Sequence, residues 1–104
     1  MTIFHIQSDK QISDFAADIF SIFEIHDFTE HESLNYPPLN IYFKAKKDEV
    51  TFKICAEDDD AHKDSQYWLI VSANRTADLD IKALDESILK KISLAGYMLT
   101  VEND

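Results

Sequence analysis

The spacing of hydrophobic residues predicts an amphipathic helix over residues 9–25. Charged side chains fall mostly outside its hydrophobic stripe. Ser8, followed three positions later by Gln11, has the pattern of a capping box, so we expect Ser8 to cap this helix. The hydrophobic positions recur every three or four residues, which places them on one helix face: Ile12, Phe15, Ala16, Ile19, Phe20 and Phe23.

A second helix is predicted near the C-terminal end of the sequence. A polar segment precedes it, in which Asp78 or Asp80 is the expected N-cap. Gly96, the only glycine, lies where a helix commonly ends in a residue of positive φ. The hydrophobic stripe consists of Ile81, Leu84, Ile88 and Ile92, with Leu89 beside it.

Strands are predicted where hydrophobic and polar residues alternate with a period of two. Residues 40–46 and 50–56 alternate in this way, which is typical of an antiparallel hairpin with one solvent-facing side. Residues 67–71 are hydrophobic at every position, so we expect an interior strand that is covered on both faces. The other expected strands are residues 2–7, residues 97–101 and, as a short edge strand, residues 32–36.

These elements predict an α+β fold with the order β-α-β-β-β-α-β. We expect an antiparallel sheet of about five strands with two helices packed on it. A chain of 104 residues has the length of one domain, so residues 1–104 are expected to form a single domain without a linker. The pattern does not decide whether both helices cover the same face of the sheet.

The charge of the chain narrows the classes of partner. Ten Lys and Arg residues against twenty Asp and Glu residues give a net charge of −10, which opposes binding to nucleic acid or to an anionic membrane surface. One glycine cannot build a glycine-rich phosphate loop. The N-terminus lacks the pattern of a signal peptide, and no hydrophobic run has the length of a membrane span. We therefore expect a cytoplasmic protein.

No catalytic, metal or cofactor site is expected from the sequence, and the protein is not expected to be an enzyme. Cys55, the only cysteine, has no base predicted beside it. No serine is flanked by glycine as in a nucleophile elbow. The histidines are scattered over different elements without metal-ligand spacing: His5, His26, His31 and His62.

The densest charge feature is an acidic run, residues 57–64. It lacks the glycine and the final glutamate of a calcium loop, and a catalytic carboxylate pair would require burial. A solvated loop and a binding surface remain. Mutual repulsion and the neighbouring Trp68 favour binding, although a place in the core is the more common role for such a tryptophan. The acids of the run are Glu57, Asp58, Asp59, Asp60 and Asp64.

Residues 32–72 resemble small acidic immunity proteins of bacteria. Glu32-Ser33-Leu34-Asn35-Tyr36, followed by Tyr42-Phe43, is similar to the E-S-x-N-Y…Y-F stretch of immunity proteins encoded beside polymorphic and contact-dependent growth-inhibition toxins. The acidic run that leads into residues 66–70 is also similar. One difference is that residues 37–39, Pro-Pro-Leu, replace a pair of glycines found in those proteins.

The resemblance implies a cytoplasmic protein that binds and neutralises one toxin domain, often a nuclease with a basic cleft. An acidic surface would steer the protein to such a cleft. The alternative is an adaptor or regulatory module that binds another basic protein, or a peptide at a sheet edge. The expected contact residues are first Glu57, Asp58, Asp59, Asp60 and Asp64, and then Glu32 and Tyr36.

Overall fold

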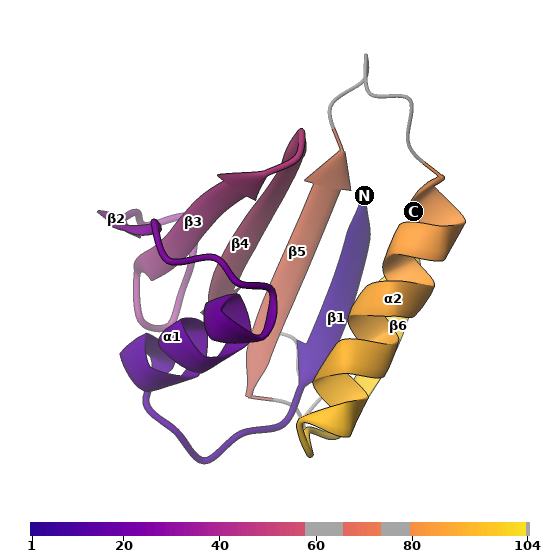
Figure 1. Ribbon diagram of the computed structural model, residues 1–104. Coiled ribbons are helices and arrows are strands. Elements are labelled where there is room, and N and C mark those ends of the chain that lie inside the picture. Colours follow the sequence, from indigo (N-terminus) through magenta and orange to yellow (C-terminus); the bar gives the residue numbers. More distant parts are fainter. Residues whose placement is uncertain (58–65, 74–79, 104) are drawn as a thin grey trace.

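Figure 1 shows a computed structural model of the chain, which describes residues 1–57, 66–73 and 80–103. In this part of the chain, six strands form one antiparallel sheet with the order β2-β3-β4-β5-β1-β6, and two helices pack on it. The elements in chain order are β1 (Thr2–Ile6), α1 (Ile12–Ile22), β2 (Thr29–Glu32), β3 (Ile41–Lys47), β4 (Val50–Ala56), β5 (Tyr67–Ala73), α2 (Ile81–Leu94) and β6 (Leu99–Asn103).

The expected α+β class is confirmed, with six strands in place of about five. The additional strand is β2, which pairs with β3 at one edge of the sheet and begins three residues before the predicted segment 32–36. Most of that segment lies instead in a turn. The backbone N–H of Asn40 donates to the carbonyl of Tyr36 at 2.9 Å, and that of Ser33 donates to the carbonyl of Asn40 at 2.9 Å.

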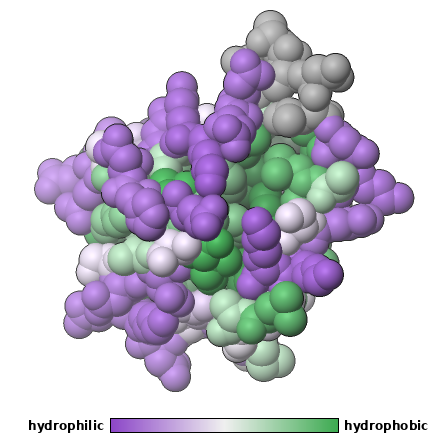
Figure 2. Space-filling model, in the orientation of Figure 1, coloured by the Kyte–Doolittle hydropathy of each residue, from purple (hydrophilic) through white to green (hydrophobic). Residues whose placement is uncertain are grey.

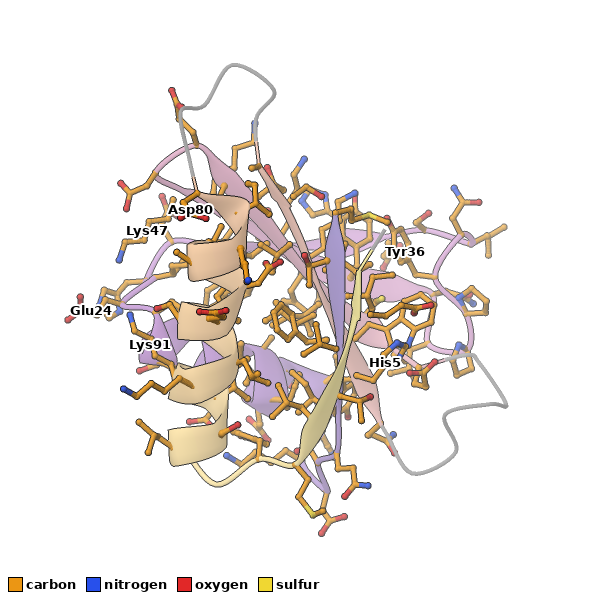
Figure 3. The ribbon with its side chains drawn as sticks, turned by 90° about the vertical axis from the view of Figure 1, so that its right-hand side faces the viewer. His5, Glu24, Tyr36, Lys47, Asp80 and Lys91 are labelled. Carbon is orange, nitrogen blue, oxygen red and sulfur yellow. The ribbon has the colours of Figure 1, made fainter. Side chains whose placement is uncertain are left out.

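Both helices lie on the same face of the sheet (Figures 1 and 3). The hydrophobic stripe of α1 packs on the central strands, where Phe15 stacks on Tyr67 and Phe23 stacks on Phe52, with ring centroids 4.5 and 5.6 Å apart. Each such side chain stabilises the fold by about 1.5–3 kcal/mol through burial. Hydrophilic side chains cover most of the outer surface on this side, with smaller hydrophobic patches between them (Figure 2).

Helix α1 begins later than its predicted first turn, and the predicted Ser8 cap is wrong. Gln11 occupies the N-cap position without a side-chain cap bond. The Ser8 hydroxyl accepts a hydrogen bond from the Lys10 N–H at 3.1 Å, which closes a small turn ahead of the helix. The Tyr67 hydroxyl donates to the Lys10 carbonyl at 2.6 Å. In a helix that began earlier, the Lys10 carbonyl would accept a hydrogen bond from within the helix. Here it accepts one from Tyr67 on the distant strand β5 instead.

Helix α2 has the ends that the sequence predicts. The Asp80 side chain accepts a hydrogen bond from the Ala83 N–H at 3.1 Å, as an N-cap does. Gly96 has a φ of +98° and donates to the Ser93 carbonyl, while the Tyr97 N–H reaches the Ile92 carbonyl. These two bonds form a Schellman motif. Within α2, only Ile88 and Ile92 are fully buried.

Strand β5 is an interior strand, as predicted, but neither helix covers its second face. Leu69 and Val71 point to the helices and are buried. Trp68 and Ile70 point to the opposite face and remain partly exposed. The expectation that both faces of this strand are covered is therefore wrong for the described residues, because the two helices share one face. The hydrophobic residues left on the other face form part of the surface described below.

The turn between β3 and β4 contains a backbone conformation that glycine would adopt at lower cost. Asp48 and Glu49 have φ values of 53° and 67°, and the flanking residues Lys47 and Val50 pair directly. Positive φ at both central positions is the type I′ hairpin turn, which favours Asn-Gly and Asp-Gly. A non-glycine residue in this region costs about 1–2 kcal/mol.

The variant Glu49→Gly is expected to raise the free energy of unfolding by about 1 kcal/mol in urea denaturation, since it relieves this cost. Glu86→Gly is the matched control, because it removes the same charge from an exposed position within α2. It is expected to lower the free energy of unfolding by about 1 kcal/mol. If both variants changed the free energy of unfolding in the same direction, the proposed conformational cost at Glu49 would be contradicted.

Candidate protein-interaction surface

The sheet face opposite the two helices, called here the helix-free face, carries a row of aromatic and polar side chains. The row crosses five neighbouring strands, from β3 to β6. His5 and Tyr36 are seen on this side of the sheet in Figure 3, away from the helices. Cross-strand pairing places the members of the row next to one another in the order Tyr42, Cys55, Trp68, His5 and Thr100.

His5, next to the β6 end of this row, is held between two carboxylates. Its Nδ1 lies 2.7 Å from a carboxylate oxygen of Glu57, and its Nε2 lies 3.0 Å from one of Glu102. His5 is 2% exposed, and its ring packs edge-to-face with that of Trp68 at a centroid distance of 5.6 Å. Since an ionised carboxylate only accepts hydrogen bonds, both contacts are satisfied together when the ring carries two protons.

The surroundings of His5 favour its charged form. Burial lowers the pKa of the imidazole, but hydrogen bonds from the ring to Glu57 and Glu102, together with the charges of these carboxylates, outweigh it. The pKa is therefore raised above its ordinary value of 6.5. His5 lies on β1, Glu102 lies on β6, and Glu57 directly follows β4. A protonated His5 therefore connects three segments that are far apart in the sequence.

Cys55, the neighbour of Trp68 in the row, is a buried thiol. It is 2% exposed, and burial together with the charge of Glu57 raises its pKa to about 12. The thiolate is the reactive form of cysteine, so at neutral pH this side chain is a small hydrophobic group. Cys55 therefore has a packing role within the sheet.

Aromatic rings stack at the other end of the row. The ring of Tyr42 lies 4.9 Å from that of His31, nearly parallel to it, and 4.4 Å from that of Tyr36. The Lys53 ammonium lies within 5.9 Å of both tyrosine rings and donates to the Tyr36 hydroxyl at 3.3 Å. These contacts fix the loop that carries Tyr36 onto the sheet and leave its ring partly exposed.

The described part of the helix-free face is mixed in charge. Lys44 and Lys53 are direct cross-strand neighbours, and Lys46 follows on the same side of β3. Glu57 and Glu102 lie towards the opposite end of the face, beside His5. The described part of this face therefore carries a basic region at the β3–β4 hairpin, which a partner would have to match with acceptors or negative charge.

Among the predicted contact residues, the structure brings two to this face. Tyr36 lies on it with part of its ring exposed. Glu57 also lies there, but its side chain is 6% exposed and is engaged with His5, so it is not the exposed contact residue that was expected. Glu32 is exposed on the edge strand β2, at a register position shared with Ile41. Asp58, Asp59, Asp60 and Asp64 lie outside the described residues.

Sequence reasoning missed the parts of this surface that depend on long-range pairing. His5 and Glu102 are 97 positions apart, and their contact follows from the pairing of β1 with β6. The stacking of Tyr36 on Tyr42 was not expected either. One sequence signal was present: Tyr42 and Lys53 fall on the solvent-facing side of the predicted hairpin.

Within residues 1–57, 66–73 and 80–103, no group of three or more His, Cys, Asp or Glu side chains is arranged to hold a metal ion. His5 illustrates the reason, because both of its ring nitrogens already contact carboxylates. The Nε2 of His31 lies 2.7 Å from the Thr29 hydroxyl.

Comparison of the chain with protein-family models, with curated proteins and with solved structures gave no match in any of the three. Of the described helices, neither has the length and hydrophobicity needed to cross a membrane. What the helix-free face can bind is accordingly inferred from its own side chains.

The His5 cluster predicts a pH-dependent stability. A group whose pKa is higher in the folded than in the unfolded state stabilises the fold fully below its unfolded pKa of 6.5, and this contribution is lost as the pH rises through the folded value. The free energy of unfolding of the wild type should therefore fall above pH 6.5, with a slope of up to about 1.4 kcal/mol per pH unit.

Urea denaturation between pH 5.5 and 9 measures this slope, and NMR titration of the His5 ring in the wild type checks the group responsible. His5→Gln should flatten the pH dependence. His26→Gln, at an exposed position after α1, should leave it unchanged. A His5 ring that titrates below pH 6.5 would contradict the assignment.

Proposed function

We propose that this protein is an immunity protein that binds and neutralises a cognate toxin domain, such as a nuclease with a basic cleft. The observation that supports the proposal most directly is the helix-free face, on which Tyr36, Tyr42 and Trp68 remain partly exposed in a chain of net charge −10. The resemblance of residues 32–72 to immunity proteins points in the same direction.

The side chains of this face have the composition of a protein-binding surface. Tyrosine and tryptophan supply most of the binding energy at many interfaces, because a rigid ring buries a large area at little entropic cost. Tyr36 is held by Tyr42 and Lys53 before any partner arrives, so little ordering is needed on binding.

The charge of the chain selects the kind of partner. An acidic protein is drawn to a basic cleft, with association faster by about 10–10³-fold at low salt. Carboxylates that occupy the positions of substrate phosphates would block a nuclease without any chemistry of their own. The proposed contacts are Tyr36 on the helix-free face and, in the acidic run, the residues that the sequence analysis singles out, Asp58, Asp59, Asp60 and Asp64.

The proposal is tested by co-expression with the toxin domain encoded directly upstream. The wild-type chain is expected to restore growth. Tyr36→Phe keeps the ring and should restore growth equally, whereas Tyr36→Ala should weaken binding to the purified toxin domain by about 10-fold or more, as measured by calorimetry. Thermal unfolding of both variants checks that the fold is intact.

Failure of the wild type to restore growth or to bind the toxin domain would overturn the proposal. A reproducible complex with a different basic protein would favour an adaptor or regulatory role instead. Equal toxin affinity of Tyr36→Ala and Tyr36→Phe would remove the helix-free face from the interface.

The acidic run is tested by charge reversal. The double variant Asp58→Lys/Asp59→Lys should slow association with the toxin domain and reduce its dependence on salt, since long-range steering acts on the rate of encounter. Stopped-flow measurements at 20–300 mM salt would show both effects. Asp9→Lys/Asp27→Lys makes the same charge change at exposed positions that flank α1 and should have a smaller effect. Equal effects would show that only net charge matters.

A further inference from the structure

Lys44 on β3 and Lys53 on β4 are direct cross-strand neighbours on the helix-free face. The Cβ atoms of such neighbours lie about 4.5–5.5 Å apart, and like charges in this arrangement destabilise a sheet. Neither ammonium group forms an ion pair with a carboxylate of the described residues. Both side chains are only partly exposed, so salt screens their repulsion less than at an open surface. The lysine pair therefore concentrates positive charge that the described part of the fold does not neutralise.

The positions around the lysine pair on this face carry no negative charge. Strand pairing places Thr29 of β2 beside Lys44, and Ile70 of β5 beside Lys53. Along β3 and β4, the next residues on the same face are two positions away, and they are Tyr42, Lys46, Thr51 and Cys55. Although the chain has twice as many acidic as basic residues, none of these neighbouring positions is acidic. The surroundings of the pair therefore favour an anion from outside.

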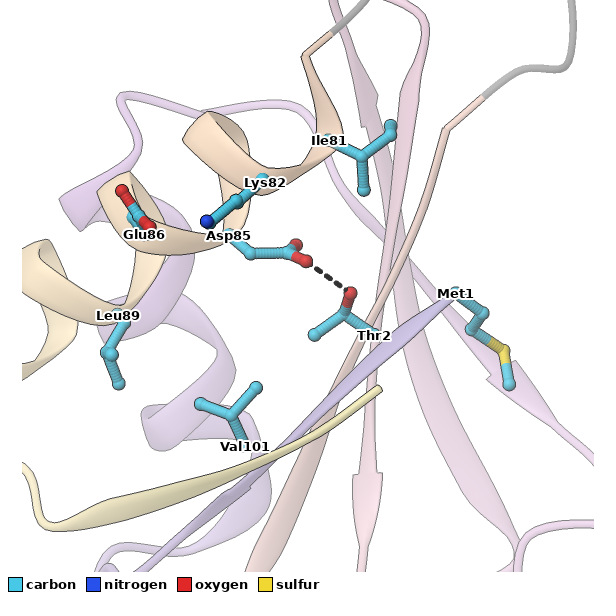
Figure 4. Close-up of a pocket in the computed structure, with 8 residues that line it drawn as sticks. All are labelled: Met1, Thr2, Ile81, Lys82, Asp85, Glu86, Leu89 and Val101. Atoms are coloured by element: carbon cyan, nitrogen blue, oxygen red, sulfur yellow. Dashed lines mark hydrogen bonds between the residues drawn. The ribbon is translucent and has the colours of Figure 1, made fainter. Parts of the chain in front are cut away.

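The groove between α2 and the strands β1 and β6 has no such preference (Figure 4). The Met1 ammonium and Lys82 carry two positive charges there, and Asp85 and Glu86 carry two negative charges. The Asp85 carboxylate also accepts a hydrogen bond from the Thr2 hydroxyl at 2.7 Å, which Figure 4 shows as a dashed line. Because these charges balance, the groove selects neither a cation nor an anion.

The lysine pair is continuous with the aromatic part of the helix-free face. The Lys53 ammonium donates to the Tyr36 hydroxyl at 3.3 Å and lies 5.5 Å from the centre of the Tyr42 ring. An ammonium group has three N–H donors, so Lys53 keeps donors for a further acceptor. The partly exposed rings beside it fit the nonpolar surface of a protein. An anion bound here therefore belongs to a surface that also covers aromatic rings.

We propose that Lys44 and Lys53 together bind a carboxylate side chain of the partner protein, next to the place where that protein contacts Tyr36. The two oxygens of one carboxylate accept hydrogen bonds from both ammonium groups, which offsets their mutual repulsion. A nucleic acid does not fit, because the net charge of −10 repels an extended polyanion. A single carboxylate within a basic protein surface is not repelled in this way.

This inference deepens the proposed function and rests on it in taking the partner to be the toxin domain. It adds a requirement to the toxin surface, which must present an acidic residue among its basic ones. Opposite charges placed at both ends of an interface fix its orientation and exclude partners with only one sign of charge.

The first test titrates phenylacetate, a carboxylate attached to an aromatic ring, into the full chain at constant ionic strength and follows amide NMR. Saturable shifts are expected at Tyr42, Lys44 and Lys53, with a dissociation constant of about 1–50 mM for so small a ligand. Lys44→Gln should weaken binding about 5-fold or more, since it removes one ammonium group and leaves the contacts of Lys53 with Tyr36. Lys90→Gln, at an exposed position on α2, is the matched control and should leave binding unchanged.

The same two variants distinguish a binding role from a structural one. Lys44→Gln removes the repulsion with Lys53, so its midpoint of urea denaturation is expected to equal or exceed that of the wild type. Its affinity for the purified toxin domain, measured by calorimetry, is nevertheless expected to fall about 5-fold or more. A lysine that only supported the fold would show a lower midpoint.

Four results would overturn the proposal. The first is no saturable shift in the wild type at 100 mM phenylacetate; if shifts then appear in Asp58→Asn/Asp59→Asn, the occupant is the acidic run of the chain itself. The second is equal binding of phenylacetate by Lys44→Gln. The third is equal binding of uncharged phenylacetamide, which would identify an aromatic surface without selectivity for an anion. The fourth is tighter binding of a single-stranded oligonucleotide than of phenylacetate.

The titration needs no toxin, so its outcome is separate from that of the growth experiment. If the wild type restores growth but does not bind phenylacetate, only the lysine-pair inference is overturned. If phenylacetate binds in a Lys44-dependent manner without rescue of growth, the carboxylate site is supported and the toxin hypothesis is overturned.

Discussion

The packing of both helices on one face of the sheet is the constraint on which the remaining structure depends. The hydrophobic stripe of α1 buries Phe15, Ile19 and Phe20 completely, and Phe4, Ile54 and Leu69 meet them from the strands. One hydrophobic layer between helices and sheet therefore supplies the core. Among the described residues no helix covers the second face, so that face must be stabilised by side chains that also tolerate water.

The helix-free face meets this requirement in two ways. At the β3–β4 side, Lys53 extends over the rings of Tyr36 and Tyr42, which shields hydrophobic surface while its charge stays near solvent. Beside β1, the buried ring of His5 is compensated by Glu57 and Glu102. A buried imidazole would destabilise the fold without these partners, because its charged form loses hydration.

The elements that could be predicted from the sequence are those determined by neighbouring residues. The α1 stripe, the β3–β4 hairpin, the Asp80 cap and the Gly96 helix end each follow from interactions within a few positions. The failures have a common cause. Ser8 loses its capping role because the Lys10 carbonyl accepts a hydrogen bond from the Tyr67 hydroxyl, which is 57 positions further along the chain.

The same distinction between local and long-range interactions explains which residues of the candidate site were predicted correctly. Tyr36 was expected as a contact residue because it belongs to the short E-S-x-N-Y stretch that resembles immunity proteins, a local feature, and it lies on the helix-free face. Glu57 was expected to be exposed because it begins an acidic run, yet its carboxylate is buried against His5, 52 positions earlier. A run of like charges indicates solvent exposure on average, but it does not reveal a distant cation that draws one member inward.

The dimensions of the sheet determine whether one partner can cover the helix-free face from Tyr42 to Glu102. Tyr42 on β3 and Glu102 on β6 are separated by four strand spacings, or about 19 Å. A standard interface of about 800 Å² per partner spans such a distance. β6 is an edge strand, and its consecutive residues Val101 and Glu102 face opposite sides of the sheet. A partner that covers the helix-free face as far as Glu102 therefore also reaches the outer edge of β6.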